Sequence, residues 1–297
     1  MAKFGRLLTA MVTPFTRDNA VDYKRAAELA GYLAANGSDG LVVAGSTGEA
    51  ATMTVKERLQ LFTAVLEAVG DKCPVIAGAG TNDTAATVEL SRGVAALGVH
   101  GLLLVAPYYN KPSQEGLYRH FAAAAEAVPH TPIIVYNVPG RTNVNISAET
   151  TLRLAQIANI AAVKEASGNL EQMGEIIRNA PADFLFYSGD DALLLPVLAI
   201  GGYGVVSVAS NIAGAQIQTM IAAYLAGDNA KAAACHLELL PLFKAMFITT
   251  NPTPVKAAVN LLGIDVGDVR LPLIPAGTRE LAVIREEMLR VGLPVKY

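Results

Sequence analysis

Eight short apolar runs recur along the first two thirds of the chain, and a stretch with helical character follows each of them. The runs are continuous rather than alternating, which is typical of parallel strands covered on both faces. A closed barrel of eight strand–helix units usually takes about 250 residues, close to the length that these runs span. We therefore predict an α/β protein with a (β/α)8 barrel, the TIM barrel, with a doubly wound open sheet as the alternative. The predicted strands are Leu7–Thr13, Gly40–Ala44, Pro74–Ala77, Gly101–Ala106, Ile133–Tyr136, Ile160–Val163, Phe184–Tyr187 and Val205–Val208.

The helical character is clearest between the second and third runs. Thr54 and Glu57 form a capping-box pattern there, in which each side chain can accept a hydrogen bond from the other residue's backbone amide. Ser113 and Ser147 are predicted to begin two further helices as N-caps. Apolar residues spaced four, three, four and three positions apart form one stripe, made of Val55, Leu59, Phe62, Leu66 and Val69.

From about Gly227 onward the chain has only helical character, punctuated by prolines. No Gly/Ser-rich linker and no run of charged residues separates this region from the rest. We predict that residues 1–226 form the barrel and that residues 227–297 form a helical region packed on it, not an independent domain.

One long stretch without charged residues, 192–227, has the hydrophobicity of a membrane span in its first half. Gly201, Gly202 and Gly204 interrupt it, and each glycine would weaken a spanning helix. The β-branched run Val205–Val208 that follows is typical of a strand. We therefore predict a helix, a turn, a strand and a second helix of a soluble barrel, without a membrane partner. Part of the apolar surplus, 52% hydrophobic against 16% charged residues, is expected in subunit interfaces.

Charge, cysteine content and missing motifs narrow the class of function. The formal net charge is −3 and no Lys/Arg-rich run occurs, which argues against a nucleic-acid partner. Cys73 and Cys235 are too far apart for a CxxC pair, so a reducing, cytoplasmic location is expected. The P-loop and GxSxG motifs are absent, and Gly78-Ala79-Gly80 lacks the third glycine of a dinucleotide fingerprint. The four histidines show no metal-ligand spacing, so neither a metal site nor a bound cofactor is predicted.

Polar side chains gather where the predicted strands end, and in a barrel of this kind the carboxyl ends of the strands carry the chemistry. These side chains also have simpler interpretations: the hydroxyls can belong to an ordinary turn, and the tyrosines can cover the core as amphipathic side chains. Together they supply hydroxyls, phenols, a guanidinium and an amine. They are Ser46 and Thr47 after the second strand, Tyr108 and Tyr109 after the fourth, Tyr136 and Arg141 at the fifth, and Lys164 after the sixth.

Lys164 is the most informative of these residues. A neutral lysine amine attacks a ketone to form a Schiff base, but at the usual pKa near 10.4 only about 4 in 10,000 lysines are neutral at pH 7. An apolar, enclosed position lowers that pKa. Lys256, in the C-terminal region, is the rival lysine and is interpreted as structural. An amine with phenols, hydroxyls and a guanidinium suits imine chemistry on a keto acid.

Five motifs at these positions follow one another in a fixed order. They are GSTGE at 45–49, PYYNKP at 107–112, YNVPGRT at 136–142, VKEASGN at 163–169 and SGDDAL at 188–193. In this order and spacing the chain resembles, over essentially its whole length, the dihydrodipicolinate synthase branch of the pyruvate-dependent class I aldolases.

The resemblance implies a role for each matching position. Lys164 is similar to the lysine that forms an imine with pyruvate, and Tyr136 to the phenol that moves protons during the reaction. Thr47 resembles the hydroxyl that links two tyrosines in a relay. Tyr109 resembles the second tyrosine, which reaches in from a neighbouring subunit. Arg141 resembles the arginine that binds the carboxylate of the incoming aldehyde.

The resemblance also implies the substrates and the assembly. Ser46 and Thr47 would hold the pyruvyl carboxylate, with Val206 near the imine lysine. The implied reaction condenses pyruvate with L-aspartate 4-semialdehyde, the first committed step toward diaminopimelate and lysine. The reaction is expected to need no cofactor, because the covalent intermediate is the imine between Lys164 and pyruvate. A homotetramer built as a dimer of dimers is expected.

Two alternatives remain at this point. The chain could act on a sugar acid, because GSTGE also occurs in the sialic acid lyases of the same superfamily; Arg141 favours the synthase, since the sugar-acid lyases lack that arginine. It could also be a non-catalytic barrel, against which the full set of site residues argues.

Regulation by lysine is predicted to be weak or absent. Members of the branch that lysine inhibits strongly have His and Glu residues in an allosteric pocket, and the matching places here hold Arg58 and Ala86. Asn82 and Tyr108 of that pocket are retained. An added cation repels the lysine ammonium, and a missing carboxylate removes its partner.

Overall fold

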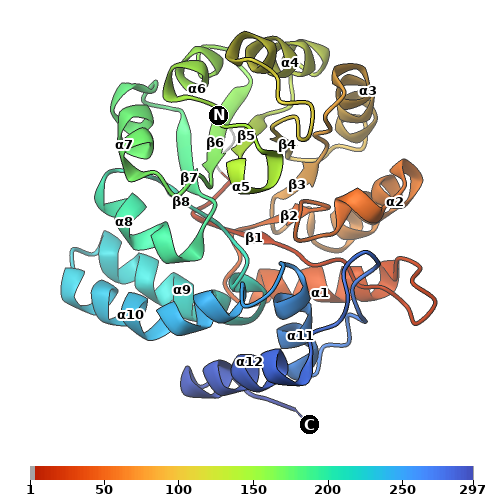
Figure 1. Ribbon diagram of the computed structural model, residues 1–297, viewed down its shortest axis with the longest axis vertical. Coiled ribbons are helices and arrows are strands. Elements are labelled where there is room, and N and C mark those ends of the chain that lie inside the picture. Colours follow the sequence, from red (N-terminus) through yellow and green to blue (C-terminus); the bar gives the residue numbers. More distant parts are fainter. Residues whose placement is uncertain (1–3, 297) are drawn as a thin grey trace.

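The computed structural model describes residues 4–296. In this part of the chain eight parallel strands close into a barrel in sequence order, as Figure 1 shows. The predicted (β/α)8 fold is confirmed, and the open-sheet alternative is wrong because β1 is hydrogen-bonded to both β2 and β8. The strands are β1 (Leu7–Ala10), β2 (Gly40–Val43), β3 (Val75–Gly78), β4 (Gly101–Val105), β5 (Ile133–Asn137), β6 (Ile160–Glu165), β7 (Leu185–Ser188) and β8 (Gly204–Ser207).

Helices follow the strands and surround the barrel (Figure 1). The predicted caps are confirmed: Thr54 and Glu57 form the capping box of α2, and Ser113 and Ser147 cap α4 and α6. The helices are α1 (Tyr23–Ala35), α2 (Val55–Val69), α3 (Thr84–Ala95), α4 (Gln114–Ala127), α5 (Pro139–Thr142), α6 (Ala148–Leu154), α7 (Leu170–Asn179), α8 (Leu194–Ala199), α9 (Ser210–Leu225), α10 (Asn229–Ala245), α11 (Thr253–Leu261) and α12 (Thr278–Arg290), with 3-10 helices η1 (Ala50–Thr52) and η2 (Asp191–Leu193).

The stretch without charged residues forms α8, β8 and α9, as its glycine pattern predicts. Gly201 has a positive φ of 98° in the turn between α8 and β8, a backbone conformation that side chains other than glycine rarely adopt. Within residues 4–296, no helix combines the length and apolar character needed to cross a bilayer. The hydrophobicity of this stretch is instead explained by packing, because β8 is buried at every position.

The C-terminal helices lie along one side of the barrel, next to α9 and α1 (Figure 1). α10 packs on α9 and α12, and α11 packs on α9 and α12. Apolar residues of these helices, among them Phe243, Val255 and Ile284, belong to the same buried cluster as Leu7 of β1. The region therefore shares its core with the barrel.

Two strand ends differ from the prediction in a way that affects the site. β1 ends at Ala10 rather than Thr13, since the Val12 amide donates to the Asn211 side chain (3.2 Å) instead of to a neighbouring strand. β6 continues through Glu165, so Lys164 belongs to the strand, paired with Tyr136 of β5 and Tyr187 of β7. A side chain in the ladder is held more rigidly than one on a loop.

Candidate active site

Five of the predicted site residues line a single cavity of about 320 Å³ at the carboxyl ends of the strands. The loop after β2, the ends of β5 and β6, and helix α5 supply them. Residues from η2 and α10 and the segment before α11 complete the wall, so the C-terminal region closes one side. The five are Ser46, Thr47, Tyr136, Arg141 and Lys164.

Lys164 is 5% exposed, and its Nζ lies 4.1 Å from the centre of the Tyr136 ring. Burial lowers the pKa of Lys164 to about 7, because desolvation penalises the ammonium form. The negative charge of Asp191 opposes this change, and the positive charge of Arg141 adds to it. About half of the amine is therefore neutral at pH 7, against a tiny fraction at the ordinary pKa.

Tyr136 stays protonated beside this amine. Burial raises the pKa of Tyr136 to about 12, although the charge of Arg141 and a hydrogen bond with the Ser46 hydroxyl favour the phenolate. A neutral phenol next to a partly neutral amine can donate a proton to a departing hydroxide and take one back.

The hydroxyl beside Tyr136 is that of Ser46 and not that of Thr47. The Thr47 side chain is buried, and its Oγ1 accepts a hydrogen bond from Asn251 Nδ2 at 2.9 Å. The side-chain hydrogen bond of Thr47 joins it to Asn251, whereas Ser46 is the hydrogen-bond partner of Tyr136, so the geometry favours Ser46 over Thr47 for the relay. Ser46 has the contact with Tyr136 that a relay needs.

Asn251 is a site residue that sequence reasoning missed. It is 5% exposed, its side chain binds Thr47, and its backbone oxygen accepts from Arg141 Nη2 at 3.0 Å. It thus connects two predicted substrate-binding residues from a position 110 residues beyond Arg141. The C-terminal region was predicted only to pack on the barrel, and no motif in the sequence pointed to this contact.

Asp191 is the second residue that was missed, in the SGDDAL motif after β7. Its Oδ2 accepts hydrogen bonds from the amides of Val208 (3.0 Å) and Ala209 (2.9 Å). Its Oδ1 has no hydrogen-bond partner among the described residues. Burial raises the pKa of Asp191, while its negative charge favours the protonated form of Lys164. It therefore acts on the amine electrostatically.

Two of the residues with a predicted catalytic or substrate-binding role do not line the cavity. Val206 is buried in the same interior cluster as Tyr136 and does not line the cavity, whereas Val208 does. Tyr109 is 87% exposed on the loop after β4 and has a positive φ of 75°. In the single chain its side chain lies outside the cavity, on the surface.

Lys256 has the structural environment that the sequence analysis expected. Its Nζ lies 3.0 Å from Glu49 Oε1 and donates to the Asp268 carbonyl at 2.7 Å. Both charged side chains are almost fully buried, and Nζ also lies 4.1 Å from the Phe15 ring centre. Burial lowers the pKa of Lys256, and the charge of Glu49 opposes that change. Its Nζ is engaged by Glu49 and the Asp268 carbonyl, and the side chain does not line the cavity that contains Lys164, so Lys256 is not placed to act as the nucleophile.

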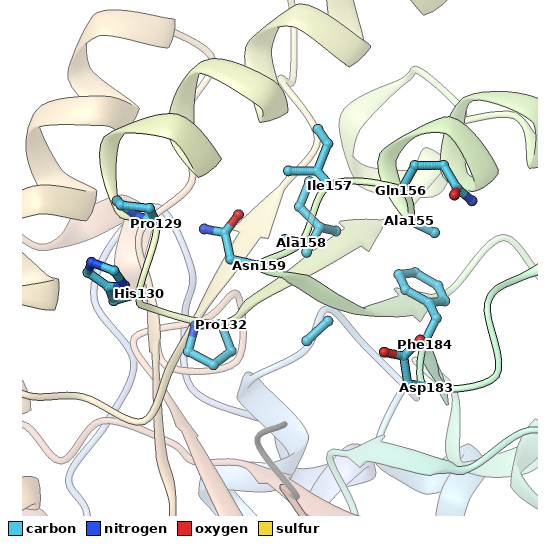
Figure 2. A pocket seen from close by; sticks show the side chains of 12 residues that line it. Pro129, His130, Pro132, Ala155, Gln156, Ile157, Ala158, Asn159, Asp183 and Phe184 are labelled. Carbon is cyan, nitrogen blue, oxygen red and sulfur yellow. The ribbon is translucent and has the colours of Figure 1, made fainter.

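A larger hollow, of about 510 Å³, lies at the opposite end of the barrel (Figure 2). Its walls come from the segments that precede β5, β6 and β7, and it contains none of the predicted site residues. Asn159, which Figure 2 shows in its wall, is occupied in binding the carbonyls of Ala125 and Val128. Among residues 4–296, no cluster of His, Cys, Asp and Glu side chains is arranged to hold a metal ion.

The sequence profile of the Dihydrodipicolinate synthetase family matches residues 3–288. The 4-hydroxy-tetrahydrodipicolinate synthase of Moorella thermoacetica is 58% identical over 98% of this chain and 99% of that protein. The solved dihydrodipicolinate synthase of Bacillus anthracis superposes with a TM-score of 0.95 at 46% identity, over 97% of this chain and 99% of that one. The dihydrodipicolinate synthase of Cyanidioschyzon merolae, solved with lysine bound, gives a TM-score of 0.96 at 49% identity, over 97% of this chain and 98% of that one.

The matched profile covers nearly the whole chain, including the helices that follow the barrel. Sequence and backbone agree with those of the relatives over the same residues. The chain belongs to the dihydrodipicolinate synthetase family.

Proposed function

We propose that this enzyme condenses pyruvate with L-aspartate 4-semialdehyde through an imine on Lys164. The neutral amine attacks the ketone carbon, and water leaves to give the iminium. Loss of a methyl proton gives an enamine, whose carbon attacks the aldehyde carbon. The amino group of the second substrate then attacks the imine carbon and releases Lys164, which closes the ring of 4-hydroxy-tetrahydrodipicolinate.

The polar residues of the cavity have separate roles in these reaction steps. Tyr136 and Ser46 carry protons to and from the reacting oxygens. Thr47, held by Asn251, binds the pyruvyl carboxylate. Arg141 lies at the same cavity and binds the carboxylate of the aldehyde, as a guanidinium does best with two parallel hydrogen bonds.

The buried Lys164 amine beside the Tyr136 phenol is the observation that carries this proposal. Cyanoborohydride reduction in the presence of pyruvate, followed by peptide mass mapping, tests it. We expect a pyruvyl adduct on the peptide that contains Lys164. Lys164→Met should abolish the adduct, and Lys256 serves as the internal control. An adduct on Lys256, or none at all, would overturn the mechanism.

The sugar-acid alternative has less support. Arg141 is present at the cavity, and the relatives at 51–58% identity bear the synthase name. A substrate screen separates the two activities: turnover with L-aspartate 4-semialdehyde is expected, and turnover restricted to N-acetylneuraminate or 2-keto-3-deoxygluconate would reverse the assignment.

The assembly and location follow from the same proposal. The exposed Tyr109 completes the Tyr136–Ser46 relay of a neighbouring subunit, within a tetramer built as a dimer of dimers. Two free cysteines, Cys73 and Cys235, fit a cytoplasmic enzyme kept reduced. The relevant partners are the two small substrates and further copies of the chain.

A further inference from the structure

The last residues of β5 and β6 form two cross-strand pairs that face opposite ways. Tyr136 lies opposite Lys164 in the ladder, and Asn137 lies opposite Glu165. Because successive side chains of a strand point to opposite faces, the first pair reaches the cavity and the second lies on the side of the surrounding helices. Asn137 and Glu165 are both fully buried. The proposed imine lysine is therefore followed directly by a buried carboxylate that does not line its cavity.

Glu165 has hydrogen-bond donors around it but no counter-charge. Among residues 4–296, no basic side chain lies within ion-pair distance of its carboxylate. Oε1 accepts from the Ser167 amide at 2.7 Å, and Oε2 accepts from Gln172 Nε2 at 3.0 Å. Asn137 Nδ2 lies 3.1 Å from Oε1 and 2.9 Å from Oε2. Donors that converge from several directions fix the orientation of the carboxylate.

Asn137 extends this network to the segment between α5 and α6. Its Oδ1 accepts from the Ile146 amide at 2.9 Å, and its Nδ2 also donates to Asn145 Oδ1 at 2.7 Å. Asn145 is joined in turn to Gln172 of α7 by hydrogen bonds in both directions. The ends of β5 and β6 are therefore connected by side chains to each other, to α7 and to the segment before α6, in addition to the backbone ladder.

A carboxylate at this position is costly, because burial removes the water that a charged group binds. A neutral amide of the same shape would avoid that cost. Glu165→Gln, however, would turn an NH2 group toward at least one of the donors that now point at an oxygen. The carboxylate alone offers an acceptor to every donor, so its burial is explained by the geometry that it imposes on the strand ends.

We propose that Glu165 is a positioning residue for the imine chemistry. Together with Asn137 it holds the ends of β5 and β6 in register, and this keeps the Tyr136 ring beside the amine that follows it in the ladder. A small misplacement of reacting groups lowers a rate steeply, so a loosened strand end is expected to slow imine formation. The inference rests on the proposed function, since it concerns the lysine that forms the proposed imine.

The rate constant of cyanoborohydride trapping with pyruvate, measured on the full-length protein, tests this role. For Glu165→Gln we expect a decrease of about tenfold. The KM for pyruvate should stay near the wild-type value, because the groups proposed to bind its carboxylate lie on the loop after β2. The pH midpoint of trapping should also stay in place, because the charges that act on the Lys164 amine are those of Asp191 and Arg141. Glu175→Gln, which removes an exposed carboxylate from α7, is the matched control and should trap at the wild-type rate.

An exchange of the two side chains gives a second, independent measurement. Asn137→Asp alone sets two carboxylates against each other and should slow trapping, as Glu165→Gln does. The double variant again places an amide opposite a carboxylate, with the two groups exchanged. It should therefore recover part of the rate, whereas two independent defects would multiply.

The fraction of chains labelled at completion separates positioning from folding. A purely structural role would lower that fraction and leave the rate constant of the folded chains unchanged, which would overturn the proposal. A wild-type rate constant in Glu165→Gln, a shifted pH midpoint, or multiplied losses in the double variant would also overturn it. Absence of an adduct in the wild type would remove the proposed function as well, whereas these results with a normal wild-type adduct would overturn this inference alone.

Discussion

The pKa of Lys164, lowered to about 7 by burial, sets the pH range in which the proposed imine can form. Only the neutral amine attacks pyruvate, so the rate of trapping by cyanoborohydride should rise through pH 7 and level off about one unit higher. The neighbouring Tyr136 remains protonated over this whole range, since its pKa is about 12. Trapping rates measured between pH 5.5 and 9 check this expectation (~0.5-unit steps suffice).

Asp191→Asn tests the charge that opposes the lowering of this pKa. The substitution removes a negative charge that favours the ammonium form, so the midpoint of the pH profile should move to lower pH. A midpoint that stays in place, or that moves upward in a folded variant, would contradict the electrostatic role of Asp191.

The two adjacent hydroxyls, Ser46 and Thr47, are expected to have separate functions. Ser46→Ala removes the hydrogen bond to Tyr136 and should lower kcat by about a hundredfold, the lower range for a lost proton-transfer group. Thr47→Val keeps the shape of the side chain but removes the acceptor for Asn251, and should mainly raise KM for pyruvate. Steady-state kinetics distinguish the roles, and the reverse pattern would return the relay to Thr47.

At the scale of secondary structure elements, a buried ion pair ties α11 to the loop after β2. Lys256→Met leaves the Glu49 carboxylate buried without its partner, which typically costs about 3–5 kcal/mol of unfolding free energy. Lys256→Met combined with Glu49→Gln should recover part of this loss. Lys24→Met, which removes an exposed lysine 3.9 Å from Glu28, is the control and should leave stability unchanged. Urea unfolding measures all three, and an equal loss in the control would contradict the pairing.

The element pattern was predictable because local chemistry decides it. Continuous apolar runs predicted all eight strands, and the Thr54–Glu57 capping box predicted where α2 begins. Strand ends were less predictable: β1 is three residues shorter than expected because Asn211, 199 positions away, takes the Val12 amide. The division at residue 226 stays a prediction, although the C-terminal helices share a core with the barrel.

At the scale of the whole molecule, subunit mixing tests the proposed role of Tyr109. Tyr109→Phe and Lys164→Met should each be nearly inactive as pure proteins, for different reasons. In mixed dimers one site combines Lys164 of the first variant with Tyr109 of the second, so random mixing should restore about a quarter of wild-type activity. No recovery after verified subunit exchange would mean that Tyr109 serves its own chain or no site at all.

Feedback by lysine is a second property of the assembled enzyme. Arg58 and Ala86 replace the His and Glu residues expected in a strongly inhibited enzyme of this branch. Half-inhibition should therefore need more than about 1 mM L-lysine. Activity titrated with L-lysine at saturating pyruvate checks this expectation, and inhibition at micromolar concentrations would show that the remaining Asn82 and Tyr108 suffice.

The barrel, the chemical groups at its strand ends and the family were predictable without the structure, because apolar runs, caps and motif order are local properties. The folded chain was needed to establish which hydroxyl lies beside Tyr136 and that Asn251 contacts Thr47 across 204 positions of sequence. It also decided that both Lys164 and Lys256 are buried, and that only Lys256 has a carboxylate as its ion-pair partner. The reason is physical: hydrogen-bond partners and desolvation depend on neighbours that only the folded chain brings together, and those neighbours set the pKa of a lysine.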